Sequence, residues 1–325
     1  MKHELEQIKS RLKDAKTAIV TAHIDPDGDA IGSVLALGLI LEQQGINATL
    51  YCQDSLPKVY RFLPGVERVK REILMSQRFD LAFVLDSSDI SRTGTKLELR
   101  SVSPFLINID HHPDNTNFGD LNYVRSVSSA AELVYDLAVS LDCKIDRKMA
   151  DCLYTAIITD TGSFRYESTT VKTFLIAAEL LKAGVNPHDI STRIYDTKSV
   201  PSIRLSGRIL ADMQFSPDGK LAWGIVTEKM LADTKAKPED LTGVVDRIRA
   251  TEGVEVAILF REEKGKTKIN FRSKDKINVS EIARRFGGGG HVKASGAVIE
   301  GPAEEIVAKV VTETAKIIKA SQFLV

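Results

Sequence analysis

A dense group of acidic and imidazole side chains follows a short apolar run near the start of the chain. The segment His23-Ile-Asp-Pro-Asp-Gly-Asp29 holds one imidazole and three carboxylates, those of Asp25, Asp27 and Asp29. So much negative charge beside an apolar strand is costly unless a cation neutralises it. Imidazole with carboxylates suits Mn²⁺, Fe²⁺, Zn²⁺ or Mg²⁺, and a majority of oxygen ligands favours Mn²⁺. The alternative is an acidic turn with Asp29 as N-cap of a helix that starts at Ala30.

Other side chains that can bind metal follow three further apolar runs. Asp86 follows LAFVL, Asp110-His111-His112 follows FLINI, and Asp160 follows LYTAIIT. Adjacent histidines on an extended segment point to opposite sides, so one could bind a metal while its neighbour contacts substrate. Each motif alone is weak, because an Asp that caps an element and a solvated His pair are both common.

Taken together, the four groups predict a two-metal site. All of them lie in the first 160 residues, at the ends of predicted strands or helices. Two divalent ions about 3.5–4 Å apart need several such ligands, with one carboxylate bridging them. A metal pair activates water and polarises a phosphoryl oxygen, so the predicted chemistry is phosphoester hydrolysis.

A second group of candidate residues lies near the C-terminus and could bind substrate. Successive glycines let backbone N–H groups converge on an anion, and two nearby cations could contact phosphate. The alternatives are a flexible glycine connector and a solvated strand end. The candidate substrate-binding residues are Arg272, Lys274, Gly288, Gly289, Gly290, His291 and Ser295.

The elements that must position these residues alternate between short apolar runs and amphipathic segments. Strands are expected at 17–23, 48–52, 81–85 and 105–109, and helices at 30–44, 129–141, 148–159 and 171–183. This alternation predicts an α/β fold with a mostly parallel sheet and helices on both faces. Ligands of such sheets bind at the carboxyl ends of the strands, where the polar motifs lie.

Two prolines and weak periodicity in 184–205 place a domain junction there. The sequence therefore predicts a catalytic domain at 1–185, a linker at 186–210 and a smaller α/β domain at 211–325. In the smaller domain, strands are expected at 221–227, 254–261, 266–272 and 297–300, and helices at 279–286 and 303–319.

Composition sets limits on the partners of the chain. Its 325 residues include 44 basic and 44 acidic side chains, and 43% are hydrophobic, which excludes a disordered chain and an overall basic field for long nucleic acid. The three cysteines show no metal-ligand spacing and indicate a reduced compartment. With no secretory signal and no apolar run of about 20 residues, we expect a cytoplasmic protein without a membrane span.

The ordered motifs resemble those of a known enzyme family. HIDPDGDAIGS, LDSSD, DHHP and TDTGSF resemble the four motifs of the DHH phosphoesterases, and GGGGHVKASG resembles the signature of their accessory DHHA1 domain. Length and layout most resemble the bacterial oligoribonuclease/pAp phosphatase group, also called nanoRNases. The chain departs from the family pattern at Asp25, where a neutral residue is common, and in its run of four glycines rather than three.

The resemblance implies a role for each residue of the first group. His23 and Asp27 would bind one metal, and Asp29, His111 and Asp160 the other. Asp86 would bridge the two metals. As catalytic residues, His112 would face the scissile phosphate and Asp110 would orient an adjacent histidine. In the accessory domain, Arg272, His291 and the glycine backbone would hold the substrate.

The resemblance also implies substrates and cofactors. Two divalent metal ions, Mn²⁺ above Mg²⁺ or Co²⁺, would support hydrolysis of short RNA to 5′-mononucleotides and of 3′-phosphoadenosine 5′-phosphate (pAp) to AMP. Short substrates would lie between the domains, and a homodimer is consistent with the resemblance. The alternatives are a cyclic di-AMP or pApA phosphodiesterase, a manganese inorganic pyrophosphatase and a nucleotide-binding module without turnover.

Overall fold

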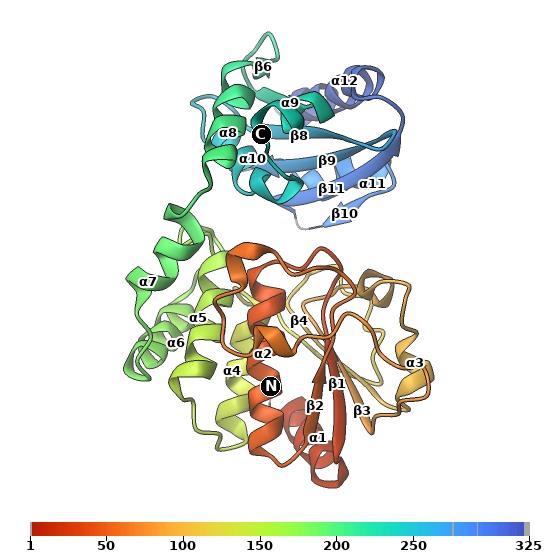
Figure 1. Ribbon diagram of the computed structural model, residues 1–325, viewed down its shortest axis with the longest axis vertical. Coiled ribbons are helices and arrows are strands. Elements are labelled where there is room, and N and C mark those ends of the chain that lie inside the picture. Colours follow the sequence, from red (N-terminus) through yellow and green to blue (C-terminus); the bar gives the residue numbers. More distant parts are fainter. Residues whose placement is uncertain (1, 275, 291, 322–325) are drawn as a thin grey trace. The chain divides into compact units, whose positions relative to one another are not determined.

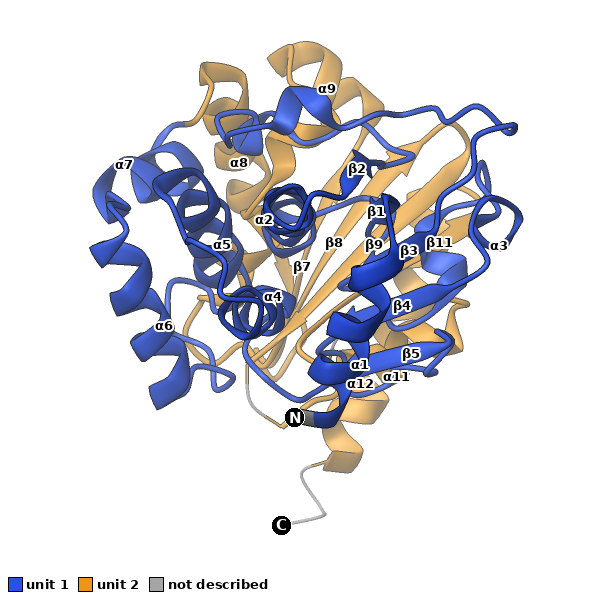
Figure 2. Cartoon of the chain, turned by 90° about the horizontal axis from the view of Figure 1, so that it is seen from below, with its two compact units in different colours: residues 1–197 blue, residues 198–325 orange. Residues whose placement is uncertain are grey.

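The computed structural model describes residues 2–274, 276–290 and 292–321. The chain divides into two compact units, Met1–Thr197 and Lys198–Val325 (Figure 1, Figure 2). No helix within the described ranges is both long and apolar enough to cross a lipid bilayer.

The first unit is built around a five-stranded sheet whose paired strands are all parallel, in the order β2-β1-β3-β4-β5. The central strands are buried along their whole length, as expected where both faces of a parallel sheet are covered. The strands are β1 (Thr17–Thr21), β2 (Asn47–Leu50), β3 (Leu81–Leu85), β4 (Leu106–Asp110) and β5 (Leu121–Val124).

Helices cover the two faces of this sheet unequally. Val20 and Phe83 share one core cluster with α2, α4 and α5, whereas Ile19 and Val84 pack on the other face with α3 and the surrounding loops. The helices of this unit are α1 (Lys2–Asp14), α2 (Gly28–Gln43), α3 (Leu99–Val102), α4 (Ala130–Ser140), α5 (Arg147–Asp160), α6 (Val171–Lys182) and α7 (Pro187–Ser191). Short 3₁₀ turns are η1 (Lys58–Tyr60), η2 (Val66–Arg68) and η3 (Ile90–Thr93).

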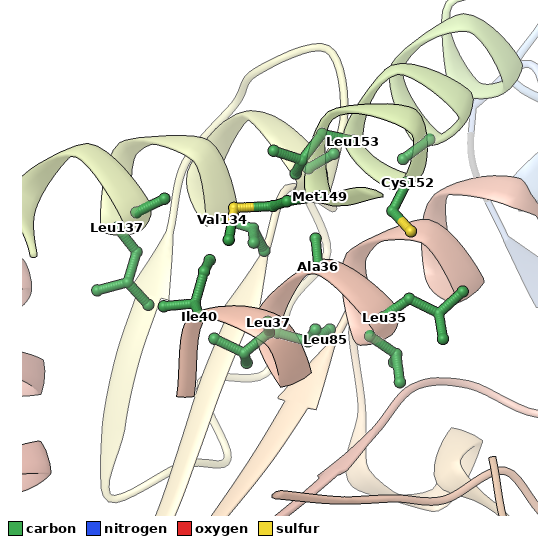
Figure 3. Close-up of a cluster of buried hydrophobic side chains, with 14 of the residues drawn as sticks. Leu35, Ala36, Leu37, Ile40, Leu85, Val134, Leu137, Met149, Cys152 and Leu153 are labelled. Carbon is green, nitrogen blue, oxygen red and sulfur yellow. The ribbon is translucent and has the colours of Figure 1, made fainter. Parts of the chain in front are cut away.

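Packing between α2, α4 and α5 forms a buried apolar core beside the sheet (Figure 3). Leu37 and Ile40 of α2 lie with Val134 of α4 and Met149 of α5 in this cluster. Close approach of α2 and α5 depends on Gly32, because a Cβ there would lie 2.4 Å from the carbonyl oxygen of Cys152.

The second unit has a mixed six-stranded sheet in the order β10-β11-β9-β8-β7-β6, in which only β7 and β8 pair in parallel among the described strands. Helices α8 and α10 pack on one face, and α11 and α12 on the other. The strands are β6 (Gln214–Phe215), β7 (Leu221–Val226), β8 (Val256–Glu263), β9 (Lys266–Ser273), β10 (Gly289–Gly290) and β11 (Ala294–Glu300). The helices are α8 (Val200–Ala211), α9 (Glu228–Thr234), α10 (Val244–Arg249), α11 (Val279–Arg285) and α12 (Ala303–Ser321), with the 3₁₀ turn η5 (Pro238–Leu241).

The predicted α/β fold, with a mostly parallel sheet followed by a smaller α/β unit, is confirmed. The segment 186–210, where the sequence predicts a linker, contains α7, the π-helical turn η4 (Thr192–Asp196) and most of α8. Pro187 and Pro201 lie at the start of α7 and α8, where the missing N–H costs nothing, so neither proline breaks a helix. The strand β5 was not predicted.

Candidate metal centre

Three neighbouring parallel strands deliver the predicted side chains to one edge of the sheet. His23 lies two residues beyond β1, Asp86 directly follows β3, and Asp110 is the last residue of β4, with both histidines directly after it. Since β1, β3 and β4 are adjacent and parallel, their carboxyl ends meet. Two helices complete the group: Asp27 and Asp29 lie at the start of α2, and Asp160 is the last residue of α5.

One set of possible metal ligands consists of His23, Asp27 and Asp86. His23 Nε2 lies 3.5 Å from Asp86 Oδ2 and 4.0 Å from Asp27 Oδ1. The other ring nitrogen, Nδ1, lies 2.7 Å from the carbonyl oxygen of Ile24. A carbonyl can only accept, so Nδ1 carries a proton and Nε2 is the nitrogen that could bind a metal.

A second set consists of Asp29, His111 and Asp160. His111 Nε2 lies 3.5 Å from Asp160 Oδ2 and 3.8 Å from Asp29 Oδ2. Its Nδ1 lies 3.2 Å from the carbonyl oxygen of Val127, so this ring is oriented in the same manner as that of His23. In both histidines a backbone carbonyl fixes the tautomer that leaves Nε2 directed at carboxylates.

Asp86 lies between the two sets. Its Oδ2 faces His23, and its Oδ1 lies 3.3 Å from His111 Nε2. Oδ1 is buried and accepts no hydrogen bond within the described residues. A buried carboxylate oxygen of this kind is expected where a metal ion binds it. Asp86 has φ of 50°, a conformation that costs energy for a residue other than glycine and recurs at functional sites.

Burial and mutual repulsion perturb the titration of these groups. Burial, together with the charges of Asp86 and Asp160, raises the pKa of Asp29 well above its usual value. Burial also raises the pKa of Asp160 to about 7, although the charge of His111 opposes the shift. Burial alone would lower the pKa of His23, but its bond to Asp86 and the charges of Asp27 and Asp86 raise it to about 9. Without metal, the cluster therefore holds protons that cations would replace.

The donor set fits a pair of divalent ions. Four carboxylates, those of Asp27, Asp29, Asp86 and Asp160, meet two imidazoles in these groups. When the carboxylates are ionised and the imidazoles neutral, the four negative charges balance the four positive charges of two divalent ions. For Asp86 itself, burial opposes ionisation, but the imidazoles of His111 and His23 hold its pKa well below its usual value.

Asp110 orients His112 rather than joining either set. His112 Nδ1 lies 2.7 Å from Asp110 Oδ1, and Asn115 Nδ2 donates to Asp110 Oδ2 at 2.6 Å. Burial alone would raise the pKa of Asp110, but the hydrogen bond and charge of His112 lower it. The carboxylate therefore accepts a hydrogen bond from Nδ1–H of His112, which directs Nε2 away from Asp110. His112 Nδ1 is also 3.6 Å from Asp86 Oδ1, which places the ring beside both sets.

The amides that hold Asp110 are not among the residues predicted from the sequence. Asn115 also donates to Asn108 Oδ1 at 2.8 Å, and Asn108 is fully buried in β4. Asn108 and Asp110 share one face of the strand, because side chains alternate along it. A polar residue inside the apolar run FLINI, two positions before an Asp, was the signal that could have revealed this network.

The acidic turn at Asp27 and Asp29 caps two helices. Neither cap is the one that the alternative interpretation predicted, in which Asp29 caps a helix starting at Ala30. Asp27, not Asp29, is the N-cap of α2, which begins at Gly28. Asp29 instead accepts hydrogen bonds from the backbone N–H groups of Ala130 and Ala131 at the start of α4, at 2.6 and 3.1 Å. Asp29 thereby fixes the start of α4 beside the metal centre, a contact that its own stretch of sequence does not reveal.

Gly28 allows the start of α2 to lie against the end of α5. A Cβ at this position would lie 2.4 Å from Oγ1 of Thr159, the residue before Asp160. The absence of a side chain at Gly28 therefore brings Asp27 and Asp29 within reach of Asp160.

In the second unit, the cations predicted to bind substrate already contact the protein. Arg272 of β9 lies between Ala257 and Ala294 of the neighbouring strands, with Nε 3.6 Å from Asp246 Oδ1. Lys274 Nζ donates to the carbonyl of Thr251 at 2.7 Å. The small neighbours leave the Arg272 side chain partly exposed, at 28%.

The glycine run is part of a sheet rather than a free connector. Gly289 and Gly290 form β10 and pair with Gly296 and Ser295 of β11. A Cβ at Gly288 would lie 2.0 Å from the carbonyl oxygen of Gly296, so this close approach requires glycine. Ser295 is buried and its Oγ donates to the carbonyl of Val279 at 2.6 Å. His291, also predicted to bind substrate, lies outside the described residues.

Comparison with known proteins links both units to described domains. Residues 17–157 match the N-terminal domain of the DHH family, and residues 224–320 match the DHHA1 domain. A relative from Thermus thermophilus, the bifunctional oligoribonuclease and PAP phosphatase NrnA, is 36% identical over 87% of this chain and 84% of its own length.

Solved structures share the fold. An exopolyphosphatase-related protein from Bacteroides fragilis superposes with a TM-score of 0.90 at 28% identity, covering 100% of this chain and 98% of its own. The exonuclease RecJ from Thermus thermophilus, solved in complex with Mn²⁺, has a TM-score of 0.53 at 14% identity, over 96% of this chain and 54% of its own. The second similarity concerns the fold alone.

Proposed function

The chain belongs to the DHH phosphoesterase family, and from this premise we propose that it hydrolyses short RNA oligonucleotides to 5′-mononucleotides and pAp to AMP. The name of the Thermus thermophilus relative, with 36% identity over most of both chains, supports both substrates. The presence of both the DHH and DHHA1 domains agrees with a catalytic domain followed by a substrate-binding domain.

The observation that carries the proposal is the position of Asp86. Its two oxygens face two different histidines, each of which belongs to a separate set of possible ligands. A carboxylate shared in this way is what a two-metal centre needs, and phosphoester hydrolysis is a reaction that such centres perform. A site for a single ion would not require the second histidine and carboxylates.

We propose that His23, Asp27 and Asp86 hold one divalent ion, and that Asp29, His111, Asp160 and Asp86 hold the other. Bound there, the ions would activate water and neutralise charge on the phosphoryl group. Carboxylate oxygens outnumber imidazoles in the set, which favours Mn²⁺ over Zn²⁺, with Mg²⁺ or Co²⁺ as alternatives. The Mn²⁺ complex of RecJ, a protein of the same fold, agrees with this choice.

His112 would transfer a proton or stabilise charge at the scissile phosphate. Asp110 accepts from Nδ1 and thereby sets the orientation of the ring, so Nε2 is the atom that would meet the leaving oxygen. Asn115 and Asn108 hold Asp110 in turn. We assign these amides a positioning role, because they contact Asp110 rather than the space between the two ligand sets.

The second unit would recognise the nucleotide part of the substrate. Arg272 offers a partly exposed guanidinium beside small residues, where a phosphate or a flat base could approach it. Lys274 lies two residues further, and the glycines 288–290 bring backbone close to the same strands.

The unpaired cysteines Cys52, Cys143 and Cys152 agree with a reducing compartment, so the proposal places the enzyme in the cytoplasm.

The decisive experiment compares substrates at saturating Mn²⁺. We expect release of mononucleotide from a labelled RNA trimer and of phosphate from pAp, each lost on chelation and restored by Mn²⁺. The same assay with pApA, cyclic di-AMP and inorganic pyrophosphate tests the alternatives. A kcat/KM for cyclic di-AMP or pyrophosphate that exceeds those for RNA and pAp would replace the proposed substrates. No turnover of any of them would overturn the proposal that the chain is an enzyme.

A further inference from the structure

Glu132 is a buried carboxylate to which the proposed chemistry gives no role. It lies in the first turn of α4 and is 1% exposed. Its Oε1 accepts hydrogen bonds from the hydroxyls of Ser128 and Thr173, at 2.5 and 2.6 Å. Its Oε2 accepts no hydrogen bond within the described residues, and Lys172 Nζ lies 3.8 Å away. Burial of a carboxylate is costly even with such partners, so packing alone does not account for an acid at this position.

The bond to Ser128 acts on the peptide group that orients His111. That group joins the carbonyl of Val127 to the N–H of Ser128, and its oxygen lies 3.2 Å from His111 Nδ1. Because a peptide group is planar, fixing Ser128 also fixes the direction of the Val127 carbonyl. The carbonyl in turn keeps Nε2 of His111 directed at Asp29 and Asp160.

The start of α4 is not capped by its own N-cap side chain. Ser129 is the N-cap residue, but its side chain makes no cap bond and its hydroxyl has no hydrogen-bond partner within the described residues. Asp29 of α2 binds the first backbone N–H groups instead. The turn at 127–129 therefore depends on Asp29, which binds the backbone of α4, and on Glu132, which binds Ser128.

We infer that Glu132 is a positioning residue for the set of ligands that contains His111. Through Ser128 it holds the Val127 carbonyl, which fixes the tautomer and the orientation of that ring. The inference rests on the proposed pair of metal ions and goes beyond it, because it assigns a buried acid outside both ligand sets to one of the two ions. Loss of Glu132 should weaken the ion held with His111 and spare the ion held with His23.

The alternative is a purely structural role, in which Glu132 only joins α4 to α6. Lys172 of α6 lies 2.7 Å from Asp136 of α4, so an ion pair joins the two helices without Glu132. A link between the helices would also have no need to include Ser128, which is fully buried in the turn before α4. The bond to Ser128 therefore favours positioning.

Two substitutions separate these roles, because each removes one hydroxyl from the same oxygen of Glu132. Ser128→Ala removes the bond on the side of Val127. Thr173→Val removes the bond on the side of α6 and a second bond, to the N–H of Thr170. Titration with Mn²⁺, followed by the electron paramagnetic resonance signal of the free ion, gives the dissociation constants.

Ser128→Ala should raise one of the two dissociation constants about tenfold and leave the other within about twofold. Thr173→Val loses more bonds but should leave both constants within about twofold, because Ser128 still binds Glu132. Glu132→Ala should match Ser128→Ala, whereas Glu132→Gln keeps an acceptor for both hydroxyls and should restore most of the affinity. Circular dichroism checks that each variant is folded.

A double-mutant cycle tests whether the effect passes through His111. His111→Ala lacks the ring that Val127 orients, so adding Ser128→Ala should not weaken the remaining Mn²⁺ binding. The inference would be overturned if Ser128→Ala had no effect, if it had the same effect with and without His111, or if Thr173→Val weakened binding as much. A wild type that binds fewer than two Mn²⁺ would overturn the proposed metal pair and the inference together.

Discussion

The two units place their candidate functional residues in different ways. In the first, the ends of adjacent parallel strands bring His23, Asp86 and Asp110 together, and side chains there face one another within 4.0 Å. In the second, Arg272 lies on an antiparallel hairpin, Lys274 directly follows it and Ser295 lies on the strand beside it, and each already bonds to its own unit. The first arrangement favours chemistry, because it concentrates charge that only cations can neutralise. The second favours recognition, because its cations are spread along a sheet.

The largest expected effect is the loss of the shared carboxylate in the first unit. Asp86→Ala removes the carboxylate whose two oxygens lie 3.5 Å from His23 Nε2 and 3.3 Å from His111 Nε2, and should lower kcat at least about 1,000-fold. The circular dichroism spectrum should be unchanged, because the loss of this carboxylate relieves its repulsion with Asp29 and Asp160 and so offsets the lost contacts. Steady-state kinetics with pAp at saturating Mn²⁺ measure the effect. A rate near that of wild type would mean that Asp86 is not shared between metals.

A smaller loss of kcat is expected from the amide that holds Asp110. Asn115→Ala removes the bond at 2.6 Å to Asp110 and should lower kcat about 10- to 100-fold with little change in KM, as for other residues that orient catalytic groups. Asn47→Ala, at an exposed position that starts β2, is the control and should have no effect. An increase in KM without a decrease in kcat would instead give Asn115 a role in substrate binding.

The metal centre should also bind cations more weakly as the pH falls. The pKa of His23 is raised to about 9 and that of Asp160 to about 7, so both groups hold protons below these values and must lose them when a metal binds. Mn²⁺ affinity should therefore rise about tenfold per pH unit for each proton displaced, up to about pH 9. Calorimetric titration with Mn²⁺ in buffers of different ionisation enthalpy counts the protons. An affinity independent of pH between 6 and 8, with no proton release, would contradict the protonated cluster.

In the second unit, the same kind of substitution should act on binding rather than on rate. Arg272→Ala should raise KM for pAp and RNA about tenfold and leave the hydrolysis of a small generic phosphodiester almost unchanged. Lys268→Ala, on the same face of β9, provides a matched loss of positive charge further along the strand. If Arg272→Ala slows the hydrolysis of both kinds of substrate equally, then the second unit does not act mainly in substrate binding, and the contrast with the first unit is wrong.

The sequence reveals the first unit more fully than the second, for a physical reason. Asp86 and Asp110 each end an apolar run, and in a parallel sheet such ends must share one edge, so their proximity follows from the strand pattern. The contacts of Asp29 with Ala130 and Ala131 do not follow from it, because they depend on how α4 packs against α2, about one hundred residues away in the chain. The pairing of Gly290 with Ser295 likewise depends on the register of β10, which four identical glycines leave open in the sequence.

The smallest expected effect concerns Ser295, which the sequence analysis assigned to substrate. Its hydroxyl is buried and donates to the carbonyl of Val279, so it ties β11 to the start of α11. Ser295→Ala should leave KM for pAp within about a factor of two and lower the free energy of unfolding by about 1 kcal/mol, the net contribution of one such bond. Urea denaturation and steady-state kinetics on the same preparation separate the two effects. An increase in KM comparable to that of Arg272→Ala, without loss of stability, would mean that Ser295 binds substrate. The second unit would then, like the first, bring its functional groups together at one site.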